Sequence, residues 1–176
     1  MGEVRIRPVE EWPEENRSAL ERLAGPDGRV PNVFTTLANH PPLFRRWLGL
    51  GDHLLNHSGL TPRTRELVIL RTAHNAGSPY EWAHHAEIGR RAGLTGAEIT
   101  RAATGPDAPG WSEEDRTVLR AVDALCAARD LPDAQWAALS ALFAREQVMD
   151  LVLTVGFYTM TAMALNAFGV ALEDGS

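Results

Sequence analysis

The feature that most constrains this chain is a pair of consecutive helices joined by a short Gly-Ser-Pro turn at residues 77–79. Thr61 and Pro62 are typical of the N-cap and the first position of a helix, and the glycine of the turn is a typical helix stop. The serine and proline of the turn repeat the start signal, which predicts a second helix as far as Gly93. Helices joined by so short a connection are expected to meet in space.

The first of these helices is predicted to be buried. Its interior, residues 67–70, is Leu-Val-Ile-Leu and therefore apolar on every side of the helix. At about 100° per residue, Glu66 falls on the same side as Ile69 and Ala73. We therefore expect the Glu66 carboxylate to lie against apolar neighbours.

The second helix carries Glu81 and His85 four residues apart, with His84 beside them at the three-residue spacing. Residues at these spacings share one face of a helix. This face would present a carboxylate and an imidazole towards the carboxylate of Glu66 on the first helix. The sequence thus predicts a Glu/Glu/His cluster.

This arrangement resembles the carboxymuconolactone decarboxylase and AhpD-like superfamily. The redox branch of that superfamily carries a Glu and then Cys-x-x-Cys-x-x-x-His at the start of the next helix. Glu66 falls on the family Glu and His85 on the family His, whereas Ser78 and Glu81 stand where the two cysteines would be. The resemblance also covers residues 30–34, 65–70, 153–158 and 165–170.

Capping and periodicity signals along the chain predict about eight helices, and the chain length allows a single domain. The resemblance implies an all-α, AhpD-like helical bundle that assembles as a homo-oligomer, either a trimer or a hexamer. The residues themselves favour an all-α chain, because no alternating β-branched run bounded by turns occurs. We expect residues 1–30 to form an N-terminal arm with a short helix, and residues 31–176 to form the carboxymuconolactone decarboxylase-like domain.

Charge and cysteine content restrict the partners and the compartment. The net charge of -6 and the absence of a basic cluster argue against a nucleic-acid partner, because phosphate contacts need concentrated Lys and Arg. Cys126 is the single cysteine, which excludes an intramolecular disulfide framework and fits a reducing cytosol. The N-terminus lacks the apolar run of a signal peptide. We expect a cytoplasmic protein.

One apolar stretch, Val148 to Val170, is long enough to span a membrane and has Asp150 as its only charged residue. It also contains Thr154, Thr161 and other polar residues, and no second such stretch exists. A helix enclosed by other helices or by a neighbouring subunit has the same composition. We therefore expect a buried or interface helix, and no membrane partner.

The residues of the cluster point to proton transfer. Without its two cysteines the chain lacks the thiolates that the redox branch needs. Two close carboxylates such as Glu66 and Glu81 cannot both ionise easily, so one would keep a proton while the other acts as a base, and His85 could shuttle that proton. The resemblance to the decarboxylase branch then implies a cofactor-independent and metal-free decarboxylase, lyase or isomerase acting on a small oxygenated acid or lactone.

Several residues also have structural interpretations. Ser78 and Glu81 fit a capping box, which would occupy the Glu81 side chain at the helix terminus. Glu66 could be an anchor paired with Arg63 or Arg71. The residues assigned to substrate binding, which could equally be packing residues, are Ser78, Tyr80, Trp82 and His84.

Three alternative functions stay open at this point. The chain could be an AhpD-like antioxidant relative that has lost its thiols, or a non-catalytic oligomeric binding protein. It could also be a mononuclear metalloenzyme with Glu66, Glu81 and His85 as ligands.

Overall fold

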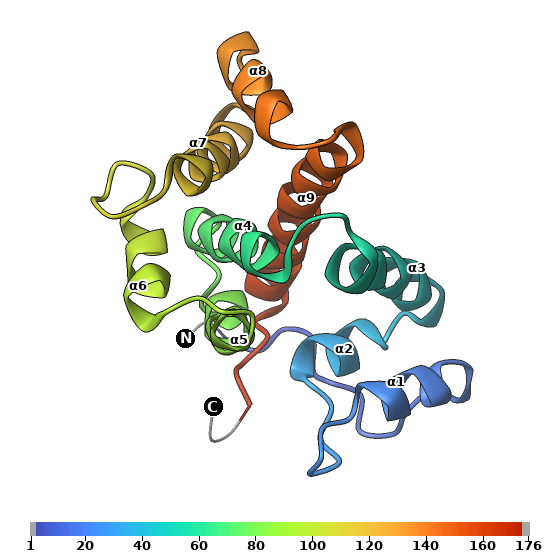
Figure 1. The fold of residues 1–176 in the computed structure, drawn as a ribbon. Helices are drawn as coiled ribbons and strands as arrows, with labels where there is room; N and C mark the ends of the chain where they lie inside the picture. The colour runs from blue at the N-terminus through green and yellow to red at the C-terminus, as the bar shows by residue number, and fades with distance from the viewer. Residues whose placement is uncertain (1–2, 174–176) are drawn as a thin grey trace. The chain divides into compact units, whose positions relative to one another are not determined.

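The computed structural model of the chain describes residues 3–173, and within them nine α-helices and no strand are present (Figure 1). The predicted all-α class is confirmed. The helices are α1 (Arg17–Leu23), α2 (Asn32–Leu37), α3 (Pro41–Asp52), α4 (Pro62–Asn75), α5 (Pro79–Arg91), α6 (Gly96–Thr104), α7 (Glu113–Ala128), α8 (Asp133–Leu142) and α9 (Arg145–Phe168), with a 3-10 turn at Glu14–Asn16 and a π-helical turn at His53–His57.

The chain divides into two compact units. One consists of the residues up to His53 together with those from Ala164 onward, and the other is Leu54–Met163. The predicted boundary between an arm at residues 1–30 and a domain at residues 31–176 stays a prediction. Every residue of the predicted Glu/Glu/His cluster belongs to the second unit.

The first unit is built around Phe44 of α3, whose side chain is fully buried among apolar residues of α1 and α2. Its N-terminal segment is attached to the end of α9, because the backbone amides of Arg5 and Ile6 both donate to the Phe168 carbonyl. Gly169 follows with a φ of 69°, and the Glu3 backbone occupies the space that a side chain at this position would need. Glycine is therefore required there.

In the second unit α4 is the central helix, and it contacts α5, α6 and α7 (Figure 1). Val68 belongs to a core shared with α7, α8 and α9, whereas Leu67 and Leu70 belong to a core shared with α5 and α6. The helix is apolar on all sides because both of its faces are packed. This explains why residues 67–70 are completely buried, as predicted.

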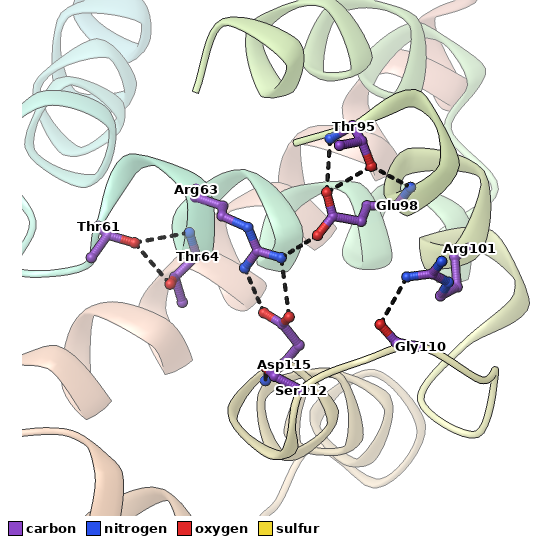
Figure 2. Close-up of polar contacts among 9 residues, drawn as sticks. All are labelled: Thr61, Arg63, Thr64, Thr95, Glu98, Arg101, Gly110, Ser112 and Asp115. Carbon is purple, nitrogen blue, oxygen red and sulfur yellow. Dashed lines mark hydrogen bonds and ion pairs between the residues drawn. The ribbon is translucent and has the colours of Figure 1, made fainter. Parts of the chain in front are cut away.

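The start of α4 is tied to α6 and α7 by Arg63 (Figure 2). Its guanidinium donates to both Asp115 oxygens, at 2.6 and 3.0 Å, and to Glu98 at 2.5 Å. Glu98 also closes a capping box with Thr95, in which the side chain of each residue accepts from the backbone amide of the other. This ion-pair network fixes the positions of three helix N-termini relative to one another.

We expect Glu98→Gln to destabilise the protein by about 1 kcal/mol at neutral pH, the usual cost of losing a helix cap. Burial raises the pKa of Glu98, but the Thr95 amide, Arg63 and the Thr95 hydroxyl together lower it to about 2. A lowered pKa stabilises the fold above the unfolded-state pKa, and this stabilisation is lost as the pH falls towards 2. Urea unfolding of both proteins between pH 7 and 3 measures the effect. The variant should show a weaker acid destabilisation than the wild type, and equal slopes would contradict the assignment.

The long helix α9 is the one described helix that is long and apolar enough to cross a membrane, and 56% of its most apolar window is buried inside the protein. One side of it, including Val148, Leu151 and Val155, packs into the core with α4, α7 and α8. The buried side agrees with the prediction of a core helix. Four large apolar side chains on α9 are about half exposed, namely Met149, Leu153, Met160 and Met163.

Candidate functional site

Glu66 of α4 is the centre of the candidate site. Its side chain is 0% exposed, and each carboxylate oxygen has one partner. Oε2 lies 2.7 Å from Nδ1 of His85 on α5, and Oε1 accepts a 3.0 Å hydrogen bond from Nε of Arg65. The predicted meeting of Glu66 and His85 is therefore present in the structure, with Arg65 as an additional member.

The alternative in which Glu66 pairs with Arg63 or Arg71 is wrong. Arg63 binds Asp115 and Glu98, and Arg71 forms a two-pronged pair with Asp123 at 2.6 and 3.0 Å. The true partner is the preceding residue, which sequence reasoning missed because adjacent residues on a helix do not normally face each other. Here the long, flexible arginine side chain brings its Nε to within 3.0 Å of the Glu66 carboxylate.

His85 is buried, and its two ring nitrogens have different roles. A carboxylate can only accept hydrogen bonds, so Nδ1 carries the proton that is donated to Glu66. In the neutral imidazole the lone pair then lies on Nε2. Arg65 balances the charge of Glu66 from the other side. The arrangement leaves His85 oriented, with Nε2 as its basic atom.

Tyr158 of α9 packs edge-on against the His85 ring, with 4.9 Å between the ring centroids and 89° between the planes. Burial raises the pKa of its hydroxyl well above the usual value, and the negative charges of Glu66 and Glu81 raise it further. Tyr158 therefore keeps its proton. Sequence reasoning assigned it no role, and its one signal was its place in the segment 153–158 that resembles the superfamily.

Glu81 of α5 is a buried acid without a hydrogen-bond partner. Its residue is 3% exposed, and within residues 3–173 neither carboxyl oxygen forms a hydrogen bond. Burial raises the pKa of Glu81 to about 8, while the nearby Ser78 hydroxyl lowers it only in part. Glu81 is therefore mainly protonated at neutral pH. The cause is burial, rather than the repulsion from Glu66 that the sequence led us to expect.

The capping box predicted at Ser78 and Glu81 is only half formed. The Ser78 hydroxyl accepts from the Glu81 backbone amide at 3.4 Å, so Ser78 is the N-cap of α5. The Glu81 side chain does not return to the Ser78 amide, which donates instead to the Ala73 carbonyl at 2.9 Å. The Glu81 carboxyl group is thus available for chemistry, and the capping interpretation of its side chain is wrong.

The remaining predicted binding residues, Tyr80, Trp82 and His84, also belong to α5. Tyr80 is buried, and the centroid of its ring lies 4.5 Å from the centroid of the His84 ring. Trp82 is half-buried and packs against the core that α4 shares with α5 and α6. The centroid of its ring lies 6.1 Å from that of the His74 ring. These contacts describe packing, and a substrate-binding role for Ser78 and these three residues stays a prediction.

Metal binding and thiol chemistry are two other possibilities for the described residues. Within the described chain, no three or more His, Cys, Asp or Glu side chains are placed to hold a metal ion, so the metalloenzyme alternative gains no ligand set. Cys126 on α7 is half-buried, and burial raises the pKa of its thiol. A raised pKa disfavours the thiolate that redox chemistry requires.

A known protein family matches the part of the chain that contains the candidate site. The profile of the carboxymuconolactone decarboxylase family matches residues 41–124, a segment that contains Glu66, Glu81 and His85. No curated protein matches the chain.

Solved structures share the fold over nearly the whole chain. An uncharacterized peroxidase-related protein with an alkylhydroperoxidase AhpD core, from Ralstonia eutropha, is 24% identical, covers 99% of this chain and 95% of its own, and has a TM-score of 0.86. A peroxidase-related protein from Silicibacter sp. TM1040 is 17% identical, with coverages of 94% and 88% and a TM-score of 0.83. The debrominase Bmp8 is 15% identical, with coverages of 98% and 94% and a TM-score of 0.80.

At these identities the structures show a common fold and leave the reaction open. The coverage includes both compact units, so the AhpD-like helical fold is confirmed for the chain as a whole. Residues 41–124 therefore match the carboxymuconolactone decarboxylase family, and the chain as a whole has the AhpD-like helical fold.

Proposed function

We propose that the chain is a cofactor-independent enzyme that transfers protons on a small oxygenated acid or lactone, in a reaction of the decarboxylase, lyase or isomerase type. The observation that carries this proposal is the unpartnered, buried carboxyl group of Glu81, four residues from the oriented imidazole of His85. An active site can hold a general acid and a general base side by side when the surroundings of one group favour its protonated form and those of the other favour its basic form.

The roles follow from the hydrogen bonds. His85 acts as the base through Nε2, because Nδ1 is bonded to Glu66. Glu66 orients the ring and balances the positive charge that develops when Nε2 takes a proton, and Arg65 forms an ion pair with Glu66 from the other side. Glu81 donates its proton to the oxygen on which negative charge develops. The raised pKa of about 8 supports this acid role at neutral pH.

The same groups serve each reaction type. In an isomerisation, His85 removes a proton from carbon, the electron pair moves into the adjacent carbonyl, and Glu81 protonates its oxygen. In a decarboxylation, the bond to the carboxylate breaks, carbon dioxide leaves, and the electron pair takes the same path into the carbonyl. The resulting enol is then protonated at carbon and returns the hydroxyl proton to a base.

The first experiment is a screen of small keto acids, unsaturated lactones and related acids. Proton NMR in deuterated buffer reports exchange at carbon, and a coupled assay reports carbon dioxide release. Turnover by the wild type that is absent in His85→Asn would support the proposal. Substrates that turn over equally with both proteins would contradict it.

The antioxidant alternative is favoured by the peroxidase-related neighbours, which share the fold. In this chain it would have to use Cys126, the one thiol of the sequence. Burial raises the pKa of that thiol and so disfavours the thiolate.

We therefore expect Cys126→Ser to leave the rate of hydrogen peroxide consumption unchanged from the background rate of the wild type. Peroxide loss measured at pH 7 for both proteins, with a thiol reductant present, checks this expectation. A peroxidase activity in the wild type that disappears in the variant would make the chain a thiol antioxidant and would remove the proton-transfer proposal.

We further propose the homo-oligomer that the superfamily resemblance implies. The half-exposed apolar side chains Met149, Leu153, Met160 and Met163 of α9 support it, because apolar groups at such regular helical spacing favour contact with another chain.

A further inference from the structure

The three arginines of α4 differ in how fully their guanidinium groups are used. Arg63 donates from both terminal nitrogens to carboxylates, and Arg71 donates from Nε and both terminal nitrogens to a carboxylate and two carbonyls. Arg65 donates from Nε to Glu66, and no hydrogen bond joins its Nη1 or Nη2 to any residue in 3–173. Two nitrogens of this guanidinium are therefore available to a ligand.

This availability is unusual because the Arg65 side chain is only 14% exposed. Mostly buried charged side chains normally have protein partners, but Nη1 and Nη2 of Arg65 are not among the fully buried polar atoms of the described residues, so solvent reaches them. Arg63 and Arg71 follow that rule on the same helix, so the difference at Arg65 belongs to its position beside Glu66 and His85. A ligand that supplies acceptor oxygens would give Nη1 and Nη2 of Arg65 hydrogen-bond partners.

The position of Arg65 also places it with the proposed acid and base. The charges of Glu66, Glu81 and Arg65 all act on the Tyr158 hydroxyl, so these groups surround one region of the second unit. The Arg65 side chain is more exposed than those of His85 and Glu66, at 14% against 9% and 0%. A ligand arriving from solvent would meet the arginine first.

We propose that Arg65 is the anion-binding residue of this site, and that Nη1 and Nη2 bind the carboxylate of a small organic acid. This inference rests on the proposed function and narrows its substrate class to acids. The planar guanidinium matches the two oxygens of a carboxylate, and such paired hydrogen bonds are among the stronger ones in proteins. Arg65 and Glu66 form an ion pair, and burial raises the pKa of Glu81 to about 8, so Glu81 adds little negative charge that would repel an anion at neutral pH.

Acetate is the probe for a test that needs no knowledge of the substrate. Backbone amide signals of residues 64–67 are followed in ¹H–¹⁵N spectra at pH 7, at constant ionic strength, while acetate is added. We expect saturable shifts with the wild type, at least tenfold weaker binding with Arg65→Gln, and unchanged binding with Arg91→Gln. Arg91 is the matched control because its side chain is 74% exposed and pairs only with Glu87 among the described residues.

Two further ligands test the chemical class. Acetamide has the shape of acetate without its charge, and equal binding of acetamide and acetate by the wild type would overturn the proposal. Inorganic phosphate offers the same acceptor chemistry from another source, and tighter binding of phosphate than of acetate would overturn the assignment to a carboxylate. These two comparisons use the wild type and therefore stand even if Arg65→Gln fails to fold.

Two variants separate this proposal from the proposed function. Arg65→Lys keeps the charge beside Glu66 but loses the planar pair of donors, so it should fold and still bind acetate several-fold more weakly than the wild type. His85→Asn should bind acetate within about threefold of the wild type. Acetate binding that survives in Arg65→Lys and Arg65→Gln alike would overturn the anion-binding role. Turnover that survives in His85→Asn would instead overturn the proposed function and leave the anion site standing.

Discussion

Replacing His85 by Asn is expected to lower turnover by at least ~10²-fold, the usual contribution of a positioned general base, without unfolding the protein. The Asn side-chain amide can replace Nδ1–H as the donor to Glu66, so the buried carboxylate keeps its partner. What the substitution removes is Nε2, the proposed base. The measurement is kcat on a substrate from the screen, together with thermal unfolding of the same samples.

His74→Asn is the matched control for this prediction, because His74 also lies in the second unit but is exposed at the end of α4. It should keep wild-type turnover. A full rate in His85→Asn would show that Nε2 takes no part in the reaction. Loss of folding in His85→Asn would assign the His85 ring a structural role, since its contact with Tyr158 is the other interaction that the substitution removes.

Glu81→Gln is expected to change stability and activity in opposite directions. Burial raises the pKa of Glu81 to about 8 from an ordinary value of 4.5. A raised pKa means that the folded state holds a proton that the unfolded state has lost. The wild type should therefore lose stability as the pH rises from about 4.5 to about 8, by roughly 3 kcal/mol up to pH 7 at 1.36 kcal/mol per unit of pKa.

Gln is neutral at every pH and has nearly the shape of the protonated Glu, so the variant should lack this loss and be more stable than the wild type at pH 8. Its turnover should nevertheless fall by at least ~10²-fold, because an amide cannot supply the proton. Urea unfolding at pH 5, 7 and 8.5 and a pH profile of kcat measure the two effects. Parallel stability curves for the two proteins would show that Glu81 is ionised in the fold, and the acid role would be wrong.

Glu98→Gln provides a check on the sign of this argument. The pKa of Glu98 is lowered to about 2 by the Thr95 amide and by Arg63, whereas that of Glu81 is raised by burial. Substitution of Glu98 should therefore remove stability above pH 4.5, and substitution of Glu81 should add it there. The two variants carry the same chemical change, so opposite signs can arise only from their surroundings.

Local chemistry was sufficient to predict most of the helices. Thr61, Ser78 and Thr95 are the N-caps of α4, α5 and α6, because a short side-chain acceptor at the start of a helix binds an amide of its first turn. The all-round apolar interior of α4 predicted its burial. The four-residue spacing of Glu81 and His85, with a short turn back to α4, predicted that His85 meets Glu66. All of these signals act within a few residues along the chain.

The tertiary structure alone decided the state of the site. Whether Glu81 completes a capping box or remains without a partner depends on the free energies of two competing arrangements, and the same Ser/Thr-x-x-Glu pattern closes the box at Thr95 and leaves it open at Ser78. Tyr158 comes from α9, far along the chain, and the use of Arg65 rather than Arg63 or Arg71 depends on where Asp115 and Asp123 of α7 lie. Burial, and hence the protonation of Glu81, depends on helices that no local pattern can place. The sequence by itself determined which residues could form the site, and the packing of α4, α5, α7 and α9 decided which atoms remain available for chemistry.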